Sequence, residues 1–293
     1  MYACFDLGGT SLKYGLLDEK GKIISKGKIK ICGEVDFIMN LIASQVKKYQ
    51  KEYDIQGICL SMPGAVDCRQ GVIYGYSAIP SIHGPNWIEE IEKRCLLPVS
   101  IENDANCAAL AETYAGAGKD YDDILCLVIG SGIGGSVIKN KKIHHGKHLS
   151  GGEFGYAVFQ QQDGELLTFS DLAATVNMVK KVQRELSKDT LEGREIFDMA
   201  RNGNEICKRA VEQFYFQLAL GIYNLQYIYD PEIVLIGGAV SEQKDFIEQI
   251  DNKLDEVLQK VKIADIKPKI KKCSYGPDAN LEGAFVHHIQ MLK

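Results

Sequence analysis

The first residues whose side chains and backbone could bind a ligand lie in a glycine turn close to the start of the chain. Residues 2–5 predict a short buried strand, a second strand is expected over 13–17, and two glycines stand between them. Glycines leave backbone N–H groups uncovered, and such groups suit an anion such as phosphate when a hydroxyl and an ammonium lie nearby. An ordinary hairpin turn with solvated charges would explain the same pattern. The residues of this turn that could bind phosphate, or a metal ion through water, are Asp6, Gly8, Gly9, Thr10 and Lys13.

A second glycine turn follows more than a hundred residues later. The apolar run 124–129 leads into Gly130, Ser131 and Gly132, and another apolar pair comes after the turn at 137–138. The turn is not a Rossmann fingerprint, because no helix pattern follows it, and it lacks the Gly-Lys-Ser/Thr of a P-loop. Two glycine-tipped hairpins so far apart suggest two lobes that face one nucleotide.

A third constellation comes after the apolar stretch 99–101, where Glu102, Asn103 and Asp104 precede an Ala- and Leu-rich helix pattern. Asp104 is the candidate general base, since a carboxylate hydrogen-bonded to an attacking hydroxyl orients it and accepts its proton. Asn103 or Asp104 would equally serve as the helix cap. The two roles are compatible if Asn103 is the residue that caps.

These motifs together resemble the ROK family of bacterial sugar kinases and sugar-responsive repressors, within the actin-like ATPase superfamily. The segments that carry the resemblance are DLGGTSLKYG at 6–15, ENDAN at 102–106 and GSGIGG at 130–135. The resemblance extends over essentially the whole chain. It implies an α/β fold of two ribonuclease H-like lobes of the actin/hexokinase type with a cleft between them. It also implies ATP and Mg²⁺ as cofactors, a small sugar as substrate and a homodimer.

The resemblance also implies roles for single residues. Asp104 matches the catalytic base, Asp6 would coordinate Mg²⁺ indirectly, and Gly238 in a third glycine turn matches the adenosine loop, although a bare turn remains an alternative. The residues implied to contact the phosphates are Gly8, Gly9, Thr10, Lys13, Gly130, Ser131 and Gly132. The residues implied to contact the sugar are Gly64, Asn103, Asp104, Glu153 and Tyr156, of which Gly64 would also fit a plain turn.

The chain departs from the family pattern at Tyr156. The family usually has Glu-x-Gly-His here, and that histidine also binds a structural zinc together with a cysteine-rich motif. No cysteine lies between 126 and 207, so we predict no structural zinc. His144, His145 and His148 could suggest a metal, but without cysteine partners or a ligand spacing we interpret them as a polar loop.

The same departure bears on the substrate. Losing the imidazole and the zinc loop should reshape the pocket around the anomeric end of the sugar. Glu153-Phe-Gly-Tyr156 without zinc resembles the β-glucoside kinase branch, which phosphorylates cellobiose and related sugars at a glucosyl 6-hydroxyl, and also some N-acetylmannosamine kinases. We therefore expect an ATP-dependent kinase for a β-glucoside, with N-acetylmannosamine kinase or glucokinase as alternatives.

Two non-catalytic alternatives are a sugar-sensing regulator and a degenerate sugar-binding protein. The first phosphate motif begins at residue 6, which leaves no room before it for a helix-turn-helix. A net charge of −5 over 293 residues also argues against nucleic-acid binding. Asp6, Lys13 and Asp104 are all present, which argues against a degenerate site.

The composition indicates an ordinary globular protein. The nine cysteines form no Cys-x-x-Cys pair and favour reduced, mostly buried thiols in a cytoplasmic protein. No apolar run approaches the ~20 residues that span a bilayer, and Asp6 interrupts the only stretch that could resemble a signal peptide.

The elements that must position these residues follow from periodicity. We expect further strands over 22–31, 57–61, 233–236 and 268–274, and a loop over 71–86. Helices are expected over 36–53, 87–94, 105–114, 171–187, 192–201, 205–229, 242–261 and 279–292. The predicted domains are 1–116 plus 279–293, with the first phosphate motif and Asp104, and 117–278, with the second phosphate and adenosine motifs. The resemblance implies that the last helix packs back on the first domain.

Overall fold

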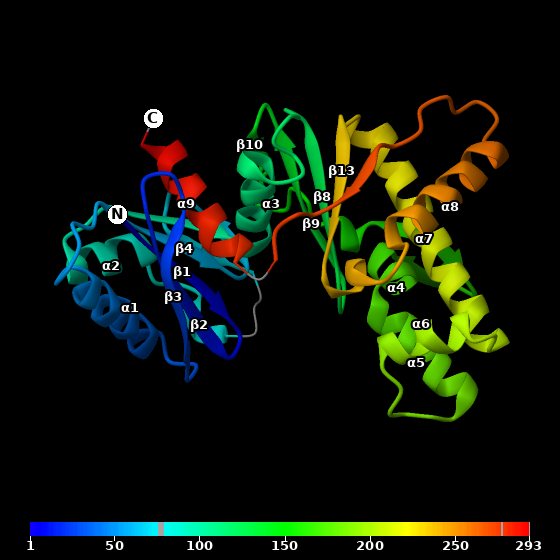
Figure 1. Cartoon of the computed structure of the whole chain (residues 1–293), viewed down its shortest axis with the longest axis horizontal. Helices are drawn as coiled ribbons and strands as arrows, with labels where there is room; N and C mark the ends of the chain where they lie inside the picture. The colour runs from blue at the N-terminus through cyan, green and yellow to red at the C-terminus, as the bar shows by residue number, and fades with distance from the viewer. Residues whose placement is uncertain (76–78, 277, 293) are drawn as a thin grey trace. The chain divides into compact units, whose positions relative to one another are not determined.

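The computed structural model describes residues 1–75, 79–276 and 278–292, and the chain forms two compact units (Figure 1). The first unit comprises Met1–Lys119, His145–Ser150 and Ser274–Lys293, and the second comprises Asp120–His144 and Gly151–Cys273. The short segment His145–Ser150 thus belongs to the first unit, although its neighbours on both sides belong to the second. The predicted division into two independent domains stays a prediction.

A five-stranded sheet organises the first unit, in the order β3-β2-β1-β4-β7. Its strands are β1 (Tyr2–Gly8), β2 (Ser11–Leu17), β3 (Ile23–Lys30), β4 (Gly57–Met62) and β7 (Val99–Asn103). The first three strands are antiparallel, and β4 and β7 run parallel to β1. The register pairs Asp6 with Ser61 and Ser61 with Glu102, so the three polar residues form one row across the sheet.

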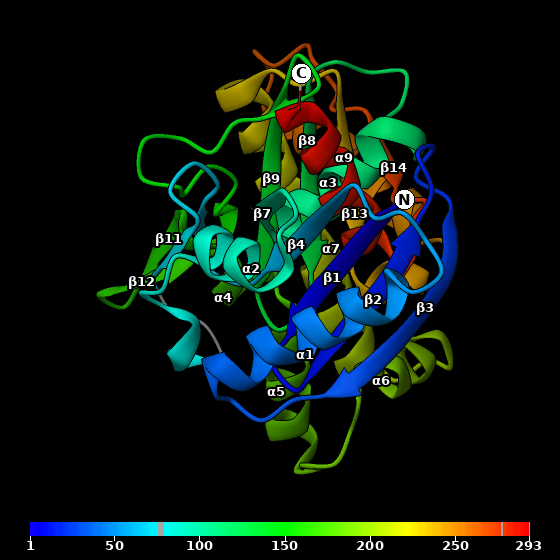
Figure 2. The same cartoon turned by 90° about the vertical axis from the view of Figure 1, so that its left-hand side faces the viewer.

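Helices cover both faces of this sheet, with α1 and α2 on one face and α3 and α9 on the other (Figures 1 and 2). Their bounds are α1 (Val35–Tyr49), α2 (Trp87–Cys95), α3 (Asp104–Ala115) and α9 (Ala279–Met291). The buried core includes Phe5 of β1, Ile42 of α1 and Trp87 of α2. Since α9 contacts α3, β1, β4 and β7, the expected return of the last helix to the first unit is confirmed.

The second unit repeats this plan. Its sheet has the order β10-β9-β8-β13-β14, with an antiparallel hairpin followed by parallel strands. The strands are β8 (Ile124–Ile129), β9 (Ile133–Lys139), β10 (Lys142–Ile143), β13 (Ile233–Gly237) and β14 (Ile270–Lys272). The helices are α4 (Phe169–Ala173), α5 (Thr175–Leu186), α6 (Gly193–Arg201), α7 (Glu205–Tyr229) and α8 (Phe246–Lys260). The long α7, with the bounds expected from the sequence, supplies much of this unit's core.

Two predicted helices end or break earlier than expected. The helix predicted over 36–53 ends at Tyr49, and Phe37 near its start is 42% exposed. The buried stripe instead begins at Ile38 and Met39. The helix predicted over 171–187 is interrupted at Ala174, whose extended backbone separates α4 from α5.

Two other segments also differ from the prediction. The loop predicted over 71–86 contains β6 (Val72–Tyr74), which pairs with β5 (Ala65–Asp67), and the short helix η1 (Pro80–Ile82). Residues 76–78 of that prediction lie outside the described residues. The helix predicted over 242–261 starts only at Phe246, because the left-handed Asp245 separates it from the short helix η3 (Ala239–Glu242).

The sequence also missed a small hairpin of β11 (Val158–Gln162) and β12 (Glu165–Thr168), which follows the short helix η2 (Phe154–Tyr156). Over the described ranges, none of the helices has the length and apolar character needed to cross a bilayer.

Candidate functional site

Asp6 lies at the centre of a polar cluster near the end of β1. Its Oδ1 accepts hydrogen bonds from Ser61 Oγ and Asn280 Nδ2, both at 2.9 Å, and its Oδ2 lies 3.0 Å from Lys13 Nζ. Asp6 is only 4% exposed, so these donors fix the orientation of the carboxylate. Asn280 comes from the first turn of α9, 274 residues away, and no pattern in the sequence pointed to it.

The turn beyond Asp6 is the expected hairpin, with Gly9 and Thr10 between the paired residues Gly8 and Ser11. The φ angle of Gly8 is not in the left-handed region. A Cβ built at Gly8 would meet only the Ser11 carbonyl oxygen, at an ordinary 3.5 Å. Packing within the chain therefore does not require a glycine at Gly8, and its missing side chain leaves the backbone open to a ligand.

Asp104 opens α3 while Asn103 caps it. The Asn103 Oδ1 accepts a hydrogen bond from the Asn106 N–H at 3.1 Å, which is standard N-cap geometry. Asp104 Oδ1 accepts from the Ala105 N–H at 2.8 Å and from Asn103 Nδ2 at 3.0 Å. Burial, reinforced by the negative charge of Asp6, raises the pKa of Asp104 to about 6. The carboxylate is thus a stronger proton acceptor than a solvated aspartate.

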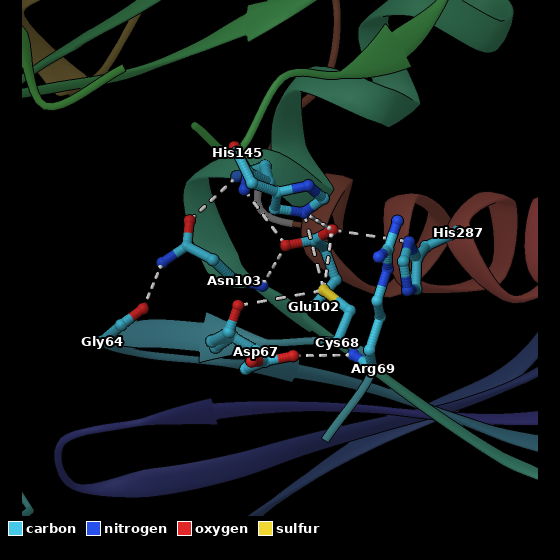
Figure 3. A network of polar contacts seen from close by, with 10 residues as sticks. Gly64, Asp67, Cys68, Arg69, Glu102, Asn103, His145 and His287 are labelled. Atoms are coloured by element: carbon cyan, nitrogen blue, oxygen red, sulfur yellow. Dashed lines mark hydrogen bonds and ion pairs between the residues drawn. The ribbon is translucent and has the colours of Figure 1, made fainter. Parts of the chain in front are cut away.

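Asn103 also ties the motif to Gly64. Its Nδ2 donates to the Gly64 carbonyl at 3.0 Å (Figure 3). Since it also donates to Asp104, both amide hydrogens are engaged inside the protein. Gly64 has a φ of 100°, and a Cβ there would press on the Ile73 side chain. The turn itself therefore requires this glycine. Any contact of Asn103 with a sugar would have to use its Oδ1.

In the second unit, the turn Gly130-Ser131-Gly132 joins β8 to β9 as expected. Gly130 and Ser131 line a pocket of about 660 Å³, together with Thr175 and Val176 of α5 and Ala239 after the third glycine turn. Gly238 has a φ of 97°, and a Cβ there would collide with the Ile129 carbonyl. The second and third glycine turns therefore meet at one pocket.

Glu153 directly precedes η2 and Tyr156 is its last residue, and both side chains are exposed, Tyr156 by 77%. Between them Gly155 packs so closely on the Ile133 carbonyl of β9 that a Cβ would not fit. Gly152, with a φ of 98°, approaches the Gly135 backbone in the same way. Close packing of the glycines against the sheet thus holds this motif in place and presents Glu153 and Tyr156 to solvent.

The sequence missed a second polar cluster around Glu102, which is fully buried. Its Oε2 lies 2.8 Å from His145 Nε2 and 3.3 Å from Cys68 Sγ (Figure 3). Burial acts to raise the pKa of Glu102, but the hydrogen bond from His145 and the nearby His287 outweigh it and hold that pKa below its usual value. In turn, the Glu102 hydrogen bond raises the pKa of His145.

His145 lies in a segment without helix or strand, as expected for a loop, but the statement that it has no cysteine partner is wrong. Cys68 Sγ lies 3.5 Å from His145 Nε2, although the two residues are 77 positions apart in the chain. In the sequence, the one signal for this cluster was Glu102 at the end of the apolar stretch 99–101. That signal did not identify Cys68 or His145 as its partners.

Comparison with known proteins finds similarity over nearly the whole chain. The model of the ROK family matches residues 2–290. A β-glucoside kinase of Listeria monocytogenes is 34% identical, over 98% of this chain and 97% of that protein. A ROK family protein of Streptococcus pneumoniae, solved in complex with sucrose, has a TM-score of 0.92 and 37% identity, over 99% of this chain and 98% of its own.

A ROK hexokinase of Thermus thermophilus has a TM-score of 0.86 and 26% identity, over 99% of both chains. These solved structures confirm the predicted α/β fold of the actin/hexokinase type.

Proposed function

We propose a specific reaction for this chain, which belongs to the ROK family and is a carbohydrate kinase. In this proposal it transfers the γ-phosphoryl group of ATP to the 6-hydroxyl of a β-glucoside such as cellobiose. The observation that carries the reaction is the half-buried Asp104, whose carboxylate is fixed by two donors and has a raised pKa. The similarity to β-glucoside kinases and the presence of Tyr156 support the acceptor.

Asp104 acts in this proposal as the base for the attacking hydroxyl. Phosphoryl transfer needs little covalent chemistry from the protein, so orientation of the hydroxyl and late acceptance of its proton are the main tasks. The Ala105 N–H and Asn103 Nδ2 both bind Oδ1, which leaves Oδ2 as the atom that can accept the proton. Asn103 and Gly64 position this carboxylate, and Glu153 and Tyr156 complete the proposed sugar contacts.

The carboxylate of Asp6 fits a magnesium ion held through water. Carboxylate oxygens are hard ligands that Mg²⁺ prefers, and an ion that keeps most of its waters needs only one or two carboxylates. When bound, the ion would neutralise charge on the β- and γ-phosphates. Lys13 would bind a terminal phosphate as a point charge, and Gly8, Gly9 and Thr10 would donate to it.

In the second unit, we assign Gly130, Ser131 and Gly132 to the phosphates and Gly238 to the adenosine loop. The pocket of about 660 Å³ that these turns help to build supports this assignment.

Two further parts of the proposal concern the whole protein. All nine cysteines are free, which supports a cytoplasmic location. We also propose that the protein is a homodimer.

The decisive experiment measures ADP release with Mg-ATP across cellobiose, an aryl β-glucoside, glucose, N-acetylmannosamine and fructose. The Asp104→Asn variant keeps the shape of the side chain and its acceptor for the Ala105 N–H, so it should fold while kcat falls by about 10²–10⁴-fold. The proposal would be supported if the wild type turns over β-glucosides and the Asp104→Asn variant does not.

Activity on glucose or N-acetylmannosamine without any β-glucoside would retain the kinase and overturn the acceptor. Binding of sugars without turnover would instead favour a sensor. Glucokinase and N-acetylmannosamine kinase are therefore outcomes of the same assay.

A further inference from the structure

We propose that Cys68, Glu102 and His145 form a zinc site in the first unit. The three residues come from separate parts of the chain, namely the β5–β6 hairpin, strand β7 and the segment His145–Ser150. Each offers one ligand atom, and all three atoms lie within 4.8 Å of one another. The proposal does not rest on the proposed kinase substrate.

The spacing of the atoms is close to that of a tetrahedral zinc site. With ordinary Zn–S and Zn–N or Zn–O bonds, a sulfur and a nitrogen or oxygen ligand lie about 3.5 Å apart. Cys68 Sγ is 3.5 Å from His145 Nε2 and 3.3 Å from Glu102 Oε2. The third separation, between His145 Nε2 and Glu102 Oε2, is 2.8 Å and needs to open by about half an ångström.

The two oxygens of Glu102 are divided between two tasks. Oε1 accepts hydrogen bonds from the Asn103 N–H at 2.7 Å and from Asn106 Nδ2 at 3.0 Å. Oε2 alone faces Cys68 and His145 (Figure 3). A metal ion on Oε2 therefore leaves the bonds to the Glu102–Asn106 motif intact, and Glu102 would bind it through one oxygen.

The ligand set selects a borderline-soft ion over magnesium. Thiolate, imidazole and carboxylate together are typical of zinc, whereas Mg²⁺ prefers oxygen ligands alone. On binding, the Cys68 thiol loses its proton to solvent and His145 binds as the neutral imidazole. Two negative ligands then balance the two charges of the ion. The fourth coordination position would hold a water molecule. His287 lies next to the site, with its Nδ1 3.4 Å from Glu102 Oε2.

Burial makes the site more than a surface cluster. Glu102 is fully buried, Cys68 is 9% exposed, and the His145 side chain is 31% exposed, which leaves an entry route on the histidine side. A bound ion would fasten His145–Ser150 to the end of β7, next to Asn103 and Asp104. This position differs from the cysteine-rich motif that the sequence lacks after Tyr156.

The test is metal binding by the purified full chain. We expect one equivalent of zinc per chain by elemental analysis after equilibration with zinc and removal of unbound metal. Cobalt should give a thiolate-to-metal absorption band in the near ultraviolet and the intense visible bands of a tetrahedral site. Cys68→Ser should abolish the thiolate band, and both Cys68→Ser and His145→Gln should lower zinc affinity at least tenfold.

Matched controls come from the same chain. His148→Gln alters an exposed histidine in the same segment, and Cys32→Ser removes an exposed thiol, so both should bind metal as the wild type does. Should Cys68→Ser fail to fold, His145→Gln gives the affinity readout at a half-buried position. Wild type that retains no zinc and shows no cobalt band would overturn the proposal, as would metal binding that neither Cys68→Ser nor His145→Gln weakens.

Discussion

Single residues of the candidate site are constrained by burial as much as by hydrogen bonds. Asp6 and Asp104 are two carboxylates whose charges influence each other, and Asp104 carries the raised pKa. Asp6 is surrounded by donors from Ser61, Asn280 and Lys13. This difference in environment supports the proposed division of roles, in which Asp6 binds a cation and Asp104 accepts a proton.

The first prediction concerns pH. Asp104 must be ionised to accept a proton, so kcat/KM should rise with pH and level off above an apparent pKa of about 6. With a solvated aspartate, this rise in kcat/KM would be centred near pH 4. Initial rates between pH 4.5 and 8 with the best sugar would measure it. A profile that stays flat down to pH 5 would contradict the role of Asp104 or its burial, and the residual rate of Asp104→Asn should lack this rise.

The second prediction concerns Lys13, whose ammonium lies 3.0 Å from Asp6. Lys13→Met keeps most of the apolar stem but removes the charge, so kcat/KM for ATP should fall about ten- to a hundredfold, the effect of losing one charge-assisted hydrogen bond. Lys28→Met is the matched control, since Lys28 lies opposite Lys13 on β3 and is exposed. Equal effects of the two variants would show that Lys13 acts only through the general surface charge.

At the scale of elements, the contact between α3 and α9 positions Asp104. Gly283 of α9 lies against the Cys107 backbone of α3, so closely that a Cβ at Gly283 would overlap the Cys107 carbonyl oxygen. Cys107 follows Asp104 by one helical turn. The approach of two helices, and not a turn, therefore explains why this position is a glycine.

We expect Gly283→Ala to force the two helices apart and to lower the free energy of unfolding by about 1–3 kcal/mol, in the range of overpacked cores. Urea unfolding followed by circular dichroism would measure the loss. Gly276→Ala is the control, because a Cβ there meets nothing within 4 Å, and it should change stability by less than about 0.5 kcal/mol. If both variants were equally stable, α3 and α9 would not be as closely packed as described.

At the scale of the whole molecule, each unit has its own apolar core, and the first unit also contains the buried His287 and His288. Burial, and then the neighbouring His287, lower the pKa of His288 to about 4. The folded state thus keeps His288 neutral, while the unfolded chain protonates it near pH 6.5. Its contribution to stability is complete above pH 6.5 and is lost as the pH falls towards 4.

The unfolding free energy of the wild type should therefore decrease between pH 6.5 and 4, and His288→Asn should make this decrease shallower by up to one proton's linkage. Denaturant titrations at several pH values would test this. His148→Asn, at an exposed position, should leave the slope unchanged. An identical slope in the wild type and His288→Asn would mean that other groups control acid unfolding.

Much of the fold could be predicted from the sequence because strands, glycine turns and long amphipathic helices depend on nearby residues. The strand Ile124–Ile129, the helix Glu205–Tyr229 and the helix that starts at Asn103 and Asp104 follow from such local patterns. The break at Ala174 and the strand Val72–Tyr74 did not, since partners elsewhere in the fold outweighed weak local preferences.

The sequence by itself determined the family, the glycine turns and the identity of Asp104 as the candidate base. Only the tertiary structure brought Asn280 to Asp6 across 274 positions and Cys68 and His145 to Glu102 across 34 and 43 positions. Such contacts depend on sheet register, on the packing of α9 and on the path of His145–Ser150. No local pattern encodes these distances, because they arise only when separate elements pack together.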